Sequence, residues 1–261
     1  DGGDGGDTAA QIEQSDANAD TKITVGSKNF TEQKVLGEIY AQGLQAAGFK
    51  VDKELSLGDE KIALKAVKGG EIDAYPEYTG TALLSFFGKS ADELPKDPQA
   101  AYEEARKGFE AEGLVALPPT PFTSSNEVAV TQETADELSL KTISDLEGKS
   151  QDLVLFGTTE CRQRIDCLLG LEENYGLEFK GFKPVDPELR YEVLDKGDAD
   201  LSILFTTDAQ LFTSDDYVLL EDDQGVLPAG NVTFVASQEA ADEAGPDFGE
   251  TIESVQENLT L

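Results

Sequence analysis

The sequence predicts an α/β protein with two lobes, in which strands and helices alternate along the chain. Three observations support this fold class. Short apolar runs that end in glycine turns precede apolar residues at helical spacing, first over residues 23–26 and 31–47. A unit of helix, glycine, acidic turn and strand occurs twice, at residues 62–75 and 191–205. Residues 117–121 and 222–230 suit neither a helix nor a central strand, and they divide the chain of 261 residues.

The first part of the chain contains the clearest elements. A strand over residues 23–26 leads to a helix that begins at Thr31, where the charge of Glu32 suits the helix dipole. Gly48 ends this helix, and a second strand follows over residues 50–52. The next helix covers residues 62–67 and precedes a further strand. We expect these strands to form a mostly parallel sheet with helices on both faces.

The second part of the chain repeats this arrangement. Strands are expected over residues 127–131, 153–156 and 201–205, and the apolar run 231–235 is expected to return to the first sheet. The predicted organisation is a disordered acidic tether over residues 1–21, a first lobe over 22–125, a second lobe over 126–229, and a return segment over 230–261. Two crossings between lobes make a hinge, and the cleft between the lobes is the predicted ligand site.

The composition excludes several function classes. Asp and Glu outnumber Lys and Arg by 53 to 20, so the net charge of −33 repels nucleic acid and anionic lipid. The chain has no His, which excludes Ser-His-Asp and Cys-His catalysis and removes the commonest zinc ligand. We therefore expect no catalytic residues, no metal and no cofactor. No run of the sequence approaches the roughly 20 apolar residues of a membrane span.

Cys161 and Cys167 are the two cysteines of the chain, with five residues between them. In a secreted protein such a pair forms a disulfide, whereas in a cytosolic protein it would suggest metal or redox chemistry. Two thiols without a His are too few for a structural zinc site unless carboxylates complete it. We predict a disulfide that stiffens the loop between the two cysteines.

Four loops could carry a binding site, because ligands of parallel sheets lie beyond the carboxyl ends of the strands. The candidates are Lys28 and Asn29 after the first strand, Tyr78 and Thr81 at the next strand-to-helix turn, Arg164 in the cysteine loop, and Phe205 at the end of a second-lobe strand.

Each candidate also has a purely structural interpretation. A Tyr ring can stack on a cation or pack in a core, as can Phe205. Thr81 can donate to a carboxylate or cap a helix. A rigid Arg164 guanidinium suits a bound carboxylate, but it can equally form an internal salt bridge to Asp166 or Glu160. Lys28 can be a solvated residue of an ordinary turn.

Several motifs occur together in the order typical of one known family. They are GSKNFTEQ from Gly26, EIDAYPEYTGTAL from Glu71, ECRQRIDCLLGL from Glu160, NYGL from Asn174, LSILFTTDAQ from Leu201 and LLEDDQG from Leu219. In these motifs the chain resembles the binding proteins of osmoprotectant ABC importers, which take glycine betaine, choline, carnitine and related quaternary ammonium compounds. The resemblance runs from about residue 22 to the end, and the ECxxRxxCLxGL pattern resembles one subgroup.

The resemblance implies a fold, a mechanism and a location. The fold is that of type II periplasmic binding proteins, with two lobes and two crossover strands. A zwitterionic or cationic solute would be enclosed between the lobes and delivered to an ABC permease in the membrane. The protein would be a monomer outside the cytoplasm, either periplasmic or anchored as a lipoprotein. Lys28, Thr81 and Arg164 would hold a carboxylate, while Tyr78 and Phe205 would be aromatic walls around the cationic end.

The sequence departs from the family pattern in two places. Ser124 and Asn126 lie in a stretch that commonly contains a Tyr of the aromatic cage, and Asn126 takes its position. A further Tyr is missing near Gly230, so Phe122 is a candidate substitute wall. The ligand is then either a loosely bound zwitterion or a more polar solute that Asn29 and Asn126 can hydrogen-bond.

Two other functions remain open from the sequence. The same fold could serve as a ligand-sensing domain that regulates a partner instead of delivering solute. An enzyme that uses only carboxylates would need two of them to converge in one cleft. Glu32, Glu77, Glu160 and Asp208 lie near the candidate loops, although those loops mainly offer Lys, Tyr, Thr and Arg.

Overall fold

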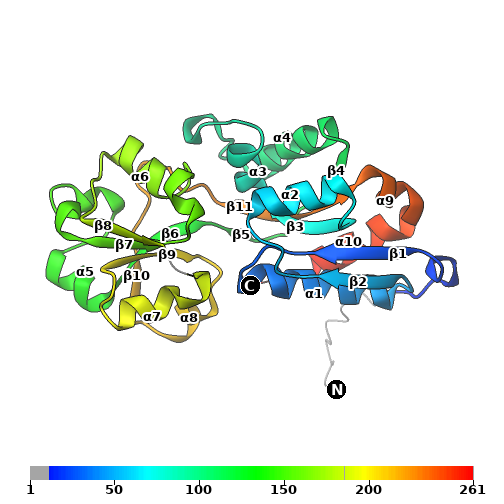
Figure 1. Ribbon diagram of the computed structural model, residues 1–261, viewed down its shortest axis with the longest axis horizontal. Helices are drawn as coiled ribbons and strands as arrows, with labels where there is room; N and C mark the ends of the chain where they lie inside the picture. Colours follow the sequence, from blue (N-terminus) through cyan, green and yellow to red (C-terminus); the bar gives the residue numbers. More distant parts are fainter. Residues whose placement is uncertain (1–11, 185, 261) are drawn as a thin grey trace, which may run out of the picture.

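The computed structural model describes residues 12–184 and 186–260. Within them the chain forms two lobes, each built around one sheet with helices on both faces (Figure 1). The first sheet has six strands and the second has five. This is the expected α/β class.

The first sheet has the strand order β2-β1-β3-β11-β4, and β5 pairs with β11 beside this path. Its strands are β1 (Lys22–Gly26), β2 (Lys50–Glu54), β3 (Ala74–Tyr78), β4 (Leu114–Ala116), β5 (Thr123–Ser124) and β11 (Gly230–Ser237). The strand β11 is buried along almost its whole length because helices cover both of its faces.

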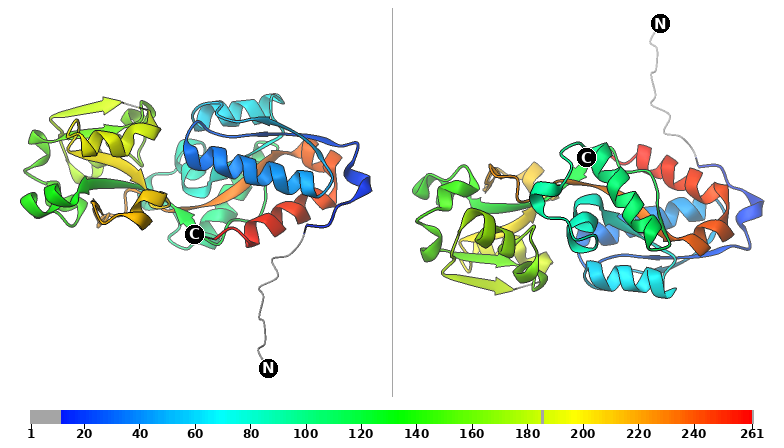
Figure 2. Two further views of the ribbon diagram at one scale, coloured as in Figure 1. Left: turned by 90° about the horizontal axis from the view of Figure 1, so that it is seen from below. Right: turned by 90° about the horizontal axis from the view of Figure 1, so that it is seen from above.

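Two helical layers enclose the first sheet, as the views in Figure 2 show. One layer contains α1 (Thr31–Ala46), α9 (Gln238–Ala244) and α10 (Pro246–Glu257), and the other contains α2 (Glu60–Gly69), α3 (Thr79–Ser85) and α4 (Pro98–Ala111). In the first layer Tyr40 of α1 stacks on Phe234 of β11 with ring centroids 4.4 Å apart. In the second layer Phe109 of α4 is fully buried against Phe86 and Phe87.

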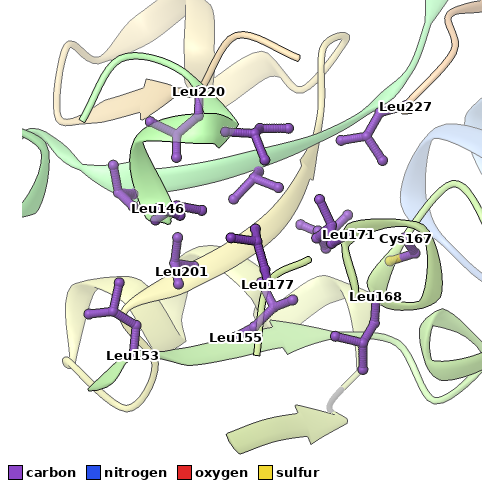
Figure 3. Close-up of a cluster of buried hydrophobic side chains, with 14 of the residues drawn as sticks. Leu146, Leu153, Leu155, Cys167, Leu168, Leu171, Leu177, Leu201, Leu220 and Leu227 are labelled. Carbon is purple, nitrogen blue, oxygen red and sulfur yellow. The ribbon is translucent and has the colours of Figure 1, made fainter. Parts of the chain in front are cut away.

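The second sheet has the order β10-β6-β9-β7-β8. Its strands are β6 (Asn126–Thr131), β7 (Val154–Gly157), β8 (Gly181–Pro184), β9 (Leu201–Phe205) and β10 (Tyr217–Leu219), and its helices are α5 (Gln132–Leu138), α6 (Leu168–Tyr175), α7 (Arg190–Asp195) and α8 (Ala209–Thr213). Leucines from strands, helices and loops form its core, and the disulfide half Cys167 borders it (Figure 3). The Cys161–Cys167 disulfide is confirmed.

The repeated helix–glycine–acidic–strand unit has the same structure in both lobes. Asp73, just before β3, accepts a hydrogen bond from the backbone N–H of Thr24 in β1 at 2.6 Å. Asp200, just before β9, accepts one from the backbone N–H of Val154 in β7 at 2.7 Å. Each aspartate thus joins the start of one parallel strand to its neighbour, which gives the acidic turn a structural purpose in both lobes.

The prediction of mostly parallel sheets is wrong for the strands that come from the other lobe. β1 is parallel to β2 and β3, and β7 is parallel to β8 and β9. However, β11 is antiparallel to β3 and β4, and β6 is antiparallel to β9 and β10. A strand that arrives from the cleft enters the sheet where the parallel strands end, so it must run in the opposite direction.

The chain passes between the sheets twice. Ser125 separates β5 of the first sheet from β6 of the second, and residues 220–229 lead back from β10 to β11. Two separate passages of the chain thus connect the lobes, an arrangement typical of a hinge. The exact lobe boundaries predicted from the sequence stay a prediction.

The predicted tether over residues 1–21 does not hold for its later part, while residues 1–11 lie outside the described residues. Residues Asp16–Asn18 form a 3-10 helix, and Asn18 is buried with its side chain donating to the carbonyl of Ala47 at 2.9 Å. The backbone N–H of Ser15 donates to the same carbonyl. These bonds satisfy the end of α1, an interaction that polarity alone does not reveal. Throughout the described part of the chain, no helix has the length and apolar character of a membrane span.

Gly230 gives a test of how closely the returning strand approaches α3. A Cβ atom at this position would lie 2.7 Å from the backbone nitrogen of Gly80 and 3.2 Å from the Thr79 hydroxyl. We predict that Gly230→Ala lowers the free energy of unfolding by about 1–3 kcal/mol, as overpacking does elsewhere. Urea unfolding followed by circular dichroism measures this. The matched control is Gly69→Ala at the exposed end of α2, where the added Cβ meets nothing. Equal stability of the two variants would contradict the close approach.

Candidate functional site

A cavity lies between the two sheets, where β3, β9 and the chain crossings meet. Its volume is about 100 Å³, and its mouth is open to solvent. Loops after β1 and β3, the start of α2, the crossing at Ser124 and the disulfide loop all contribute to its wall. The cavity therefore lies beyond the carboxyl ends of the parallel strands, as expected for an α/β fold.

The structure brings eight of the nine predicted site residues to this cavity. They are Lys28, Asn29, Tyr78, Thr81, Ser124, Asn126, Arg164 and Phe205. Phe122, proposed as a substitute aromatic wall, is not among the lining residues and packs instead against the core of the first lobe. The backbone carbonyl of Phe122 accepts bonds from Thr120 and Asn231, and these bonds hold the segment before β5 on the first sheet.

An aromatic surface runs along one side of the cavity. Phe30 lies between the two predicted walls, with its ring 6.3 Å from that of Tyr78 and 5.1 Å from that of Phe205. The sequence analysis missed Phe30, although it is part of the GSKNFTEQ motif. It is the residue just before α1, so the helix start positions its ring. Phe30, Tyr78 and Phe205 thus form one aromatic surface, and Phe156 is a fourth aromatic residue that lines the cavity.

Lys28 is buried beside this surface and is paired within the protein. Its ammonium group donates to the carboxylate of Glu77 and lies 4.6 Å from the centre of the Tyr78 ring. Glu77 also accepts from the Tyr75 hydroxyl and the backbone N–H of Tyr78. Burial raises the pKa of Glu77, although the charge of Lys28 opposes this shift. The pair is neutral as a unit, and its buried position is held by hydrogen bonds on both members.

Arg164 projects from the disulfide loop and joins the two lobes. It forms two hydrogen bonds with Asp166 of its own loop, and another with Glu60 at the start of α2, at 3.1 Å. Its guanidinium also donates to the hydroxyl of Thr81 at 3.4 Å. Burial lowers the pKa of Arg164, but the two carboxylates outweigh it and raise the pKa above its ordinary value. The predicted neighbours Arg164 and Thr81 do meet, yet protein carboxylates already hold the guanidinium.

Arg190 is a second lining residue that the sequence analysis missed. It lies at the start of α7, forms two hydrogen bonds with Asp208, and covers the Phe205 ring with its guanidinium carbon 4.5 Å from the ring centre. Asp208 also accepts from the Tyr191 hydroxyl and from the backbone N–H of Phe205. This network positions Phe205. In the sequence Arg190 is only the residue before the apolar helix pattern, and periodicity alone does not connect it to a cavity.

Polar residues at the crossing complete the wall. The side-chain amide of Asn126 donates to the backbone carbonyl of Asp166 at 2.9 Å, and the Ser124 hydroxyl lies 3.1 Å from that of Thr207. Asn29 is exposed on the other side of the cavity. A larger residue in place of Gly230 would collide with Gly80 and Thr79, which explains physically why no aromatic ring fits there.

Direct polar contacts connect the lobes around the cavity. The carboxylate of Glu32 on α1 accepts from the hydroxyls of Tyr78 and of Thr207 in the second lobe. Burial, followed by the charge of Glu32, raises the pKa of Tyr78 well above its ordinary value, so this phenol stays a neutral donor. A further contact joins Lys34 of α1 to Glu188 of the second lobe, with the ammonium group 2.6 Å from the carboxylate. The lobes therefore touch on several sides of the enclosed space.

Two α/β lobes that close on a cavity lined by aromatic rings and internally paired charges define a solute-binding protein. Among the described residues, no group of three potential metal-ligating side chains is gathered in one place.

Comparison with known proteins identifies the family. The family model described as the substrate binding domain of the ABC-type glycine betaine transport system matches residues 21–261, and the chain belongs to this family. The glycine-betaine-binding protein of Pseudomonas aeruginosa is 32% identical over 93% of this chain and 79% of its own. A carnitine transport binding protein of Listeria monocytogenes is 27% identical over 83% of this chain and 70% of its own.

A solved structure supports the fold. The crystal structure of a glycine betaine/carnitine/choline ABC transporter protein superposes with a TM-score of 0.67 at 25% identity, covering 91% of this chain and 86% of the other. The predicted type II periplasmic-binding fold and the predicted family are confirmed. The chain is a substrate-binding protein of a transport system and not an enzyme.

Glu127, one residue beyond Asn126, gives a pH test of the crossing. Burial and the negative charge of Asp222 raise its pKa from an ordinary 4.5 to about 7, although the Ser125 hydroxyl donates to it and opposes the shift. Between pH 4.5 and about pH 7, Glu127 is ionised in the unfolded chain but stays protonated in the folded protein. Stability from this group is therefore fully present below the unfolded pKa and is lost as the pH rises toward the folded pKa.

We predict that Glu127→Gln removes part of this loss. The parent protein should lose stability between about pH 5 and about pH 8, at about 1.4 kcal/mol for each unit of raised pKa, and the variant should lose less. Urea unfolding at both pH values measures the difference. Glu133→Gln, which changes an exposed side chain of α5, controls for the loss of one negative charge. Parallel pH profiles for all three proteins would contradict the assignment.

Proposed function

We propose that this protein binds a small quaternary ammonium solute in the cavity between its lobes and delivers it to an ABC permease in the membrane. The observation that carries the proposal is the continuous surface of Phe30, Tyr78 and Phe205 along an enclosed cavity. A quaternary ammonium group has no hydrogen to donate, so aromatic faces are its natural partners. The relatives named for glycine betaine and carnitine support the same class of solute.

The site residues fit this solute in two groups. The rings of Phe30, Tyr78 and Phe205 form the surface for the cationic end. Ser124 and Asn126 supply polar groups near the crossing, and Asn29 supplies one from the loop after β1. Assignment of Lys28, Thr81 and Arg164 to a ligand carboxylate stays a prediction, because both cations already have protein carboxylates as partners. A more polar solute held by Asn29 and Asn126 is the competing outcome.

The location follows from the same argument. A solute-binding subunit of an importer works outside the cytoplasm, and the Cys161–Cys167 disulfide suits an oxidising compartment. We propose that the protein acts there as a monomer, periplasmic or anchored as a lipoprotein. A ligand-sensing role on the same fold would require a signalling partner in place of the permease.

Removing one ring tests the proposed function. We expect isothermal titration of ligand-free protein to give binding heat with at least one of glycine betaine, choline and carnitine. Phe30→Ala should weaken that binding about 2- to 30-fold, since one ring contributes roughly 0.5–2 kcal/mol to a bound cation.

The control uses the same substitution away from the cavity. Phe212 on α8 is 68% exposed, so Phe212→Ala should leave the dissociation constant unchanged. Absence of heat with all three compounds would count against the quaternary ammonium solute. Equal weakening by both variants would count against the aromatic surface.

A further inference from the structure

The charges around the cavity are unequally balanced. Two cations are in one-to-one pairs, Lys28 with Glu77 and Arg190 with Asp208, and each pair is neutral as a unit. Arg164 differs, because it contacts two carboxylates. This cluster therefore carries one more negative than positive charge.

The extra carboxylate of the cluster belongs to Glu60. Asp166 already occupies Arg164 through two hydrogen bonds within the disulfide loop. Glu60 comes from the first turn of α2 in the other lobe, and its side chain is 5% exposed. Its position is set by Asp59, whose side chain caps the helix by accepting from the backbone N–H of Ile62 at 2.8 Å.

Two further carboxylates line the same cavity. Asp59 contributes one through its capping position, and Glu160 contributes another from the disulfide loop. Among the described lining residues, each of the three cations contacts a protein carboxylate, so none is left with an uncompensated positive charge. A ligand carboxylate would have to displace a protein carboxylate from Arg164 and would meet the remaining negative charges at short range. A ligand with only a positive charge meets no such cost.

We propose that Glu60 sets the charge selectivity of this site, so that it prefers a quaternary ammonium cation without a carboxylate over a zwitterion. The inference rests on the proposed function, since it concerns the solute of the same cavity. Glu60 makes the Arg164 cluster net negative and closes the guanidinium to an incoming carboxylate. The rings supply contact to the ammonium group, and the surplus charge attracts it.

Choline and glycine betaine form a matched pair for the test. Both carry a trimethylammonium group, and they differ in a hydroxyl against a carboxylate. Isothermal titration of the ligand-free protein should give a smaller dissociation constant for choline. In Glu60→Gln the dissociation constant for glycine betaine, divided by that for choline, should fall about tenfold. This is the size of effect expected for one nearby charge in a partly buried site. Asp166 still pairs Arg164 in this variant.

Two further variants make the result decisive. Glu160→Gln removes a lining charge without removing a partner of Arg164, so it should shift the ratio in the same direction even if Glu60→Gln fails to fold. Glu243→Gln on the exposed face of α9 should leave the ratio unchanged. Tighter binding of glycine betaine by the parent protein, or an unmoved ratio in folded Glu60→Gln, would overturn the inference while the proposed function survives. If Glu60→Gln does not fold, an unmoved ratio in Glu160→Gln overturns it. Binding of neither compound would instead contradict the proposed function.

Discussion

The direction in which the chain enters each sheet is the constraint on which this structure depends. β11 and β6 both arrive from the region between the lobes, so each runs antiparallel to a strand that ends there. The pairing of Asn126 with Phe205 places the crossing beside the end of β9. The same geometry brings the loops after β1 and β3 opposite the disulfide loop. One cavity between two sheets is the consequence, and every proposed ligand contact depends on it.

Charge compensation is the second organising feature of the site. A buried Lys or Arg needs a partner, and Lys28, Arg164 and Arg190 each have a carboxylate within the protein. These pairs also position the rings, because Lys28 lies over Tyr78 and Arg190 lies over Phe205. The binding surface is thus built from groups whose own charges are already satisfied. Selectivity between cationic and zwitterionic solutes then depends on the few lining carboxylates that have no cation of their own as a partner.

The contacts between lobes combine binding and closure in the same residues. Arg164 reaches Glu60 and Thr81 across the cavity, and Thr207 reaches Glu32. Substitution of these residues therefore changes both the wall of the cavity and the approach of the lobes. This coupling is the physical reason for comparing the dissociation constants of two ligands. A change in closure affects the binding of both ligands alike, whereas a change in charge affects their binding differently.

The sequence by itself determined the fold class, the family, the disulfide and eight of the residues at the cavity, because each depends on local pattern or on motif order. Hydrophobic periodicity places strands and helices, and the ends of strands place Lys28 and Tyr78 near a cleft. Only the tertiary structure decided the rest. The antiparallel crossing strands, the ring of Phe30 and the cluster around Arg164 arise from segments far apart in the chain. Glu60 lies 104 positions from Arg164, and no local pattern encodes that pairing.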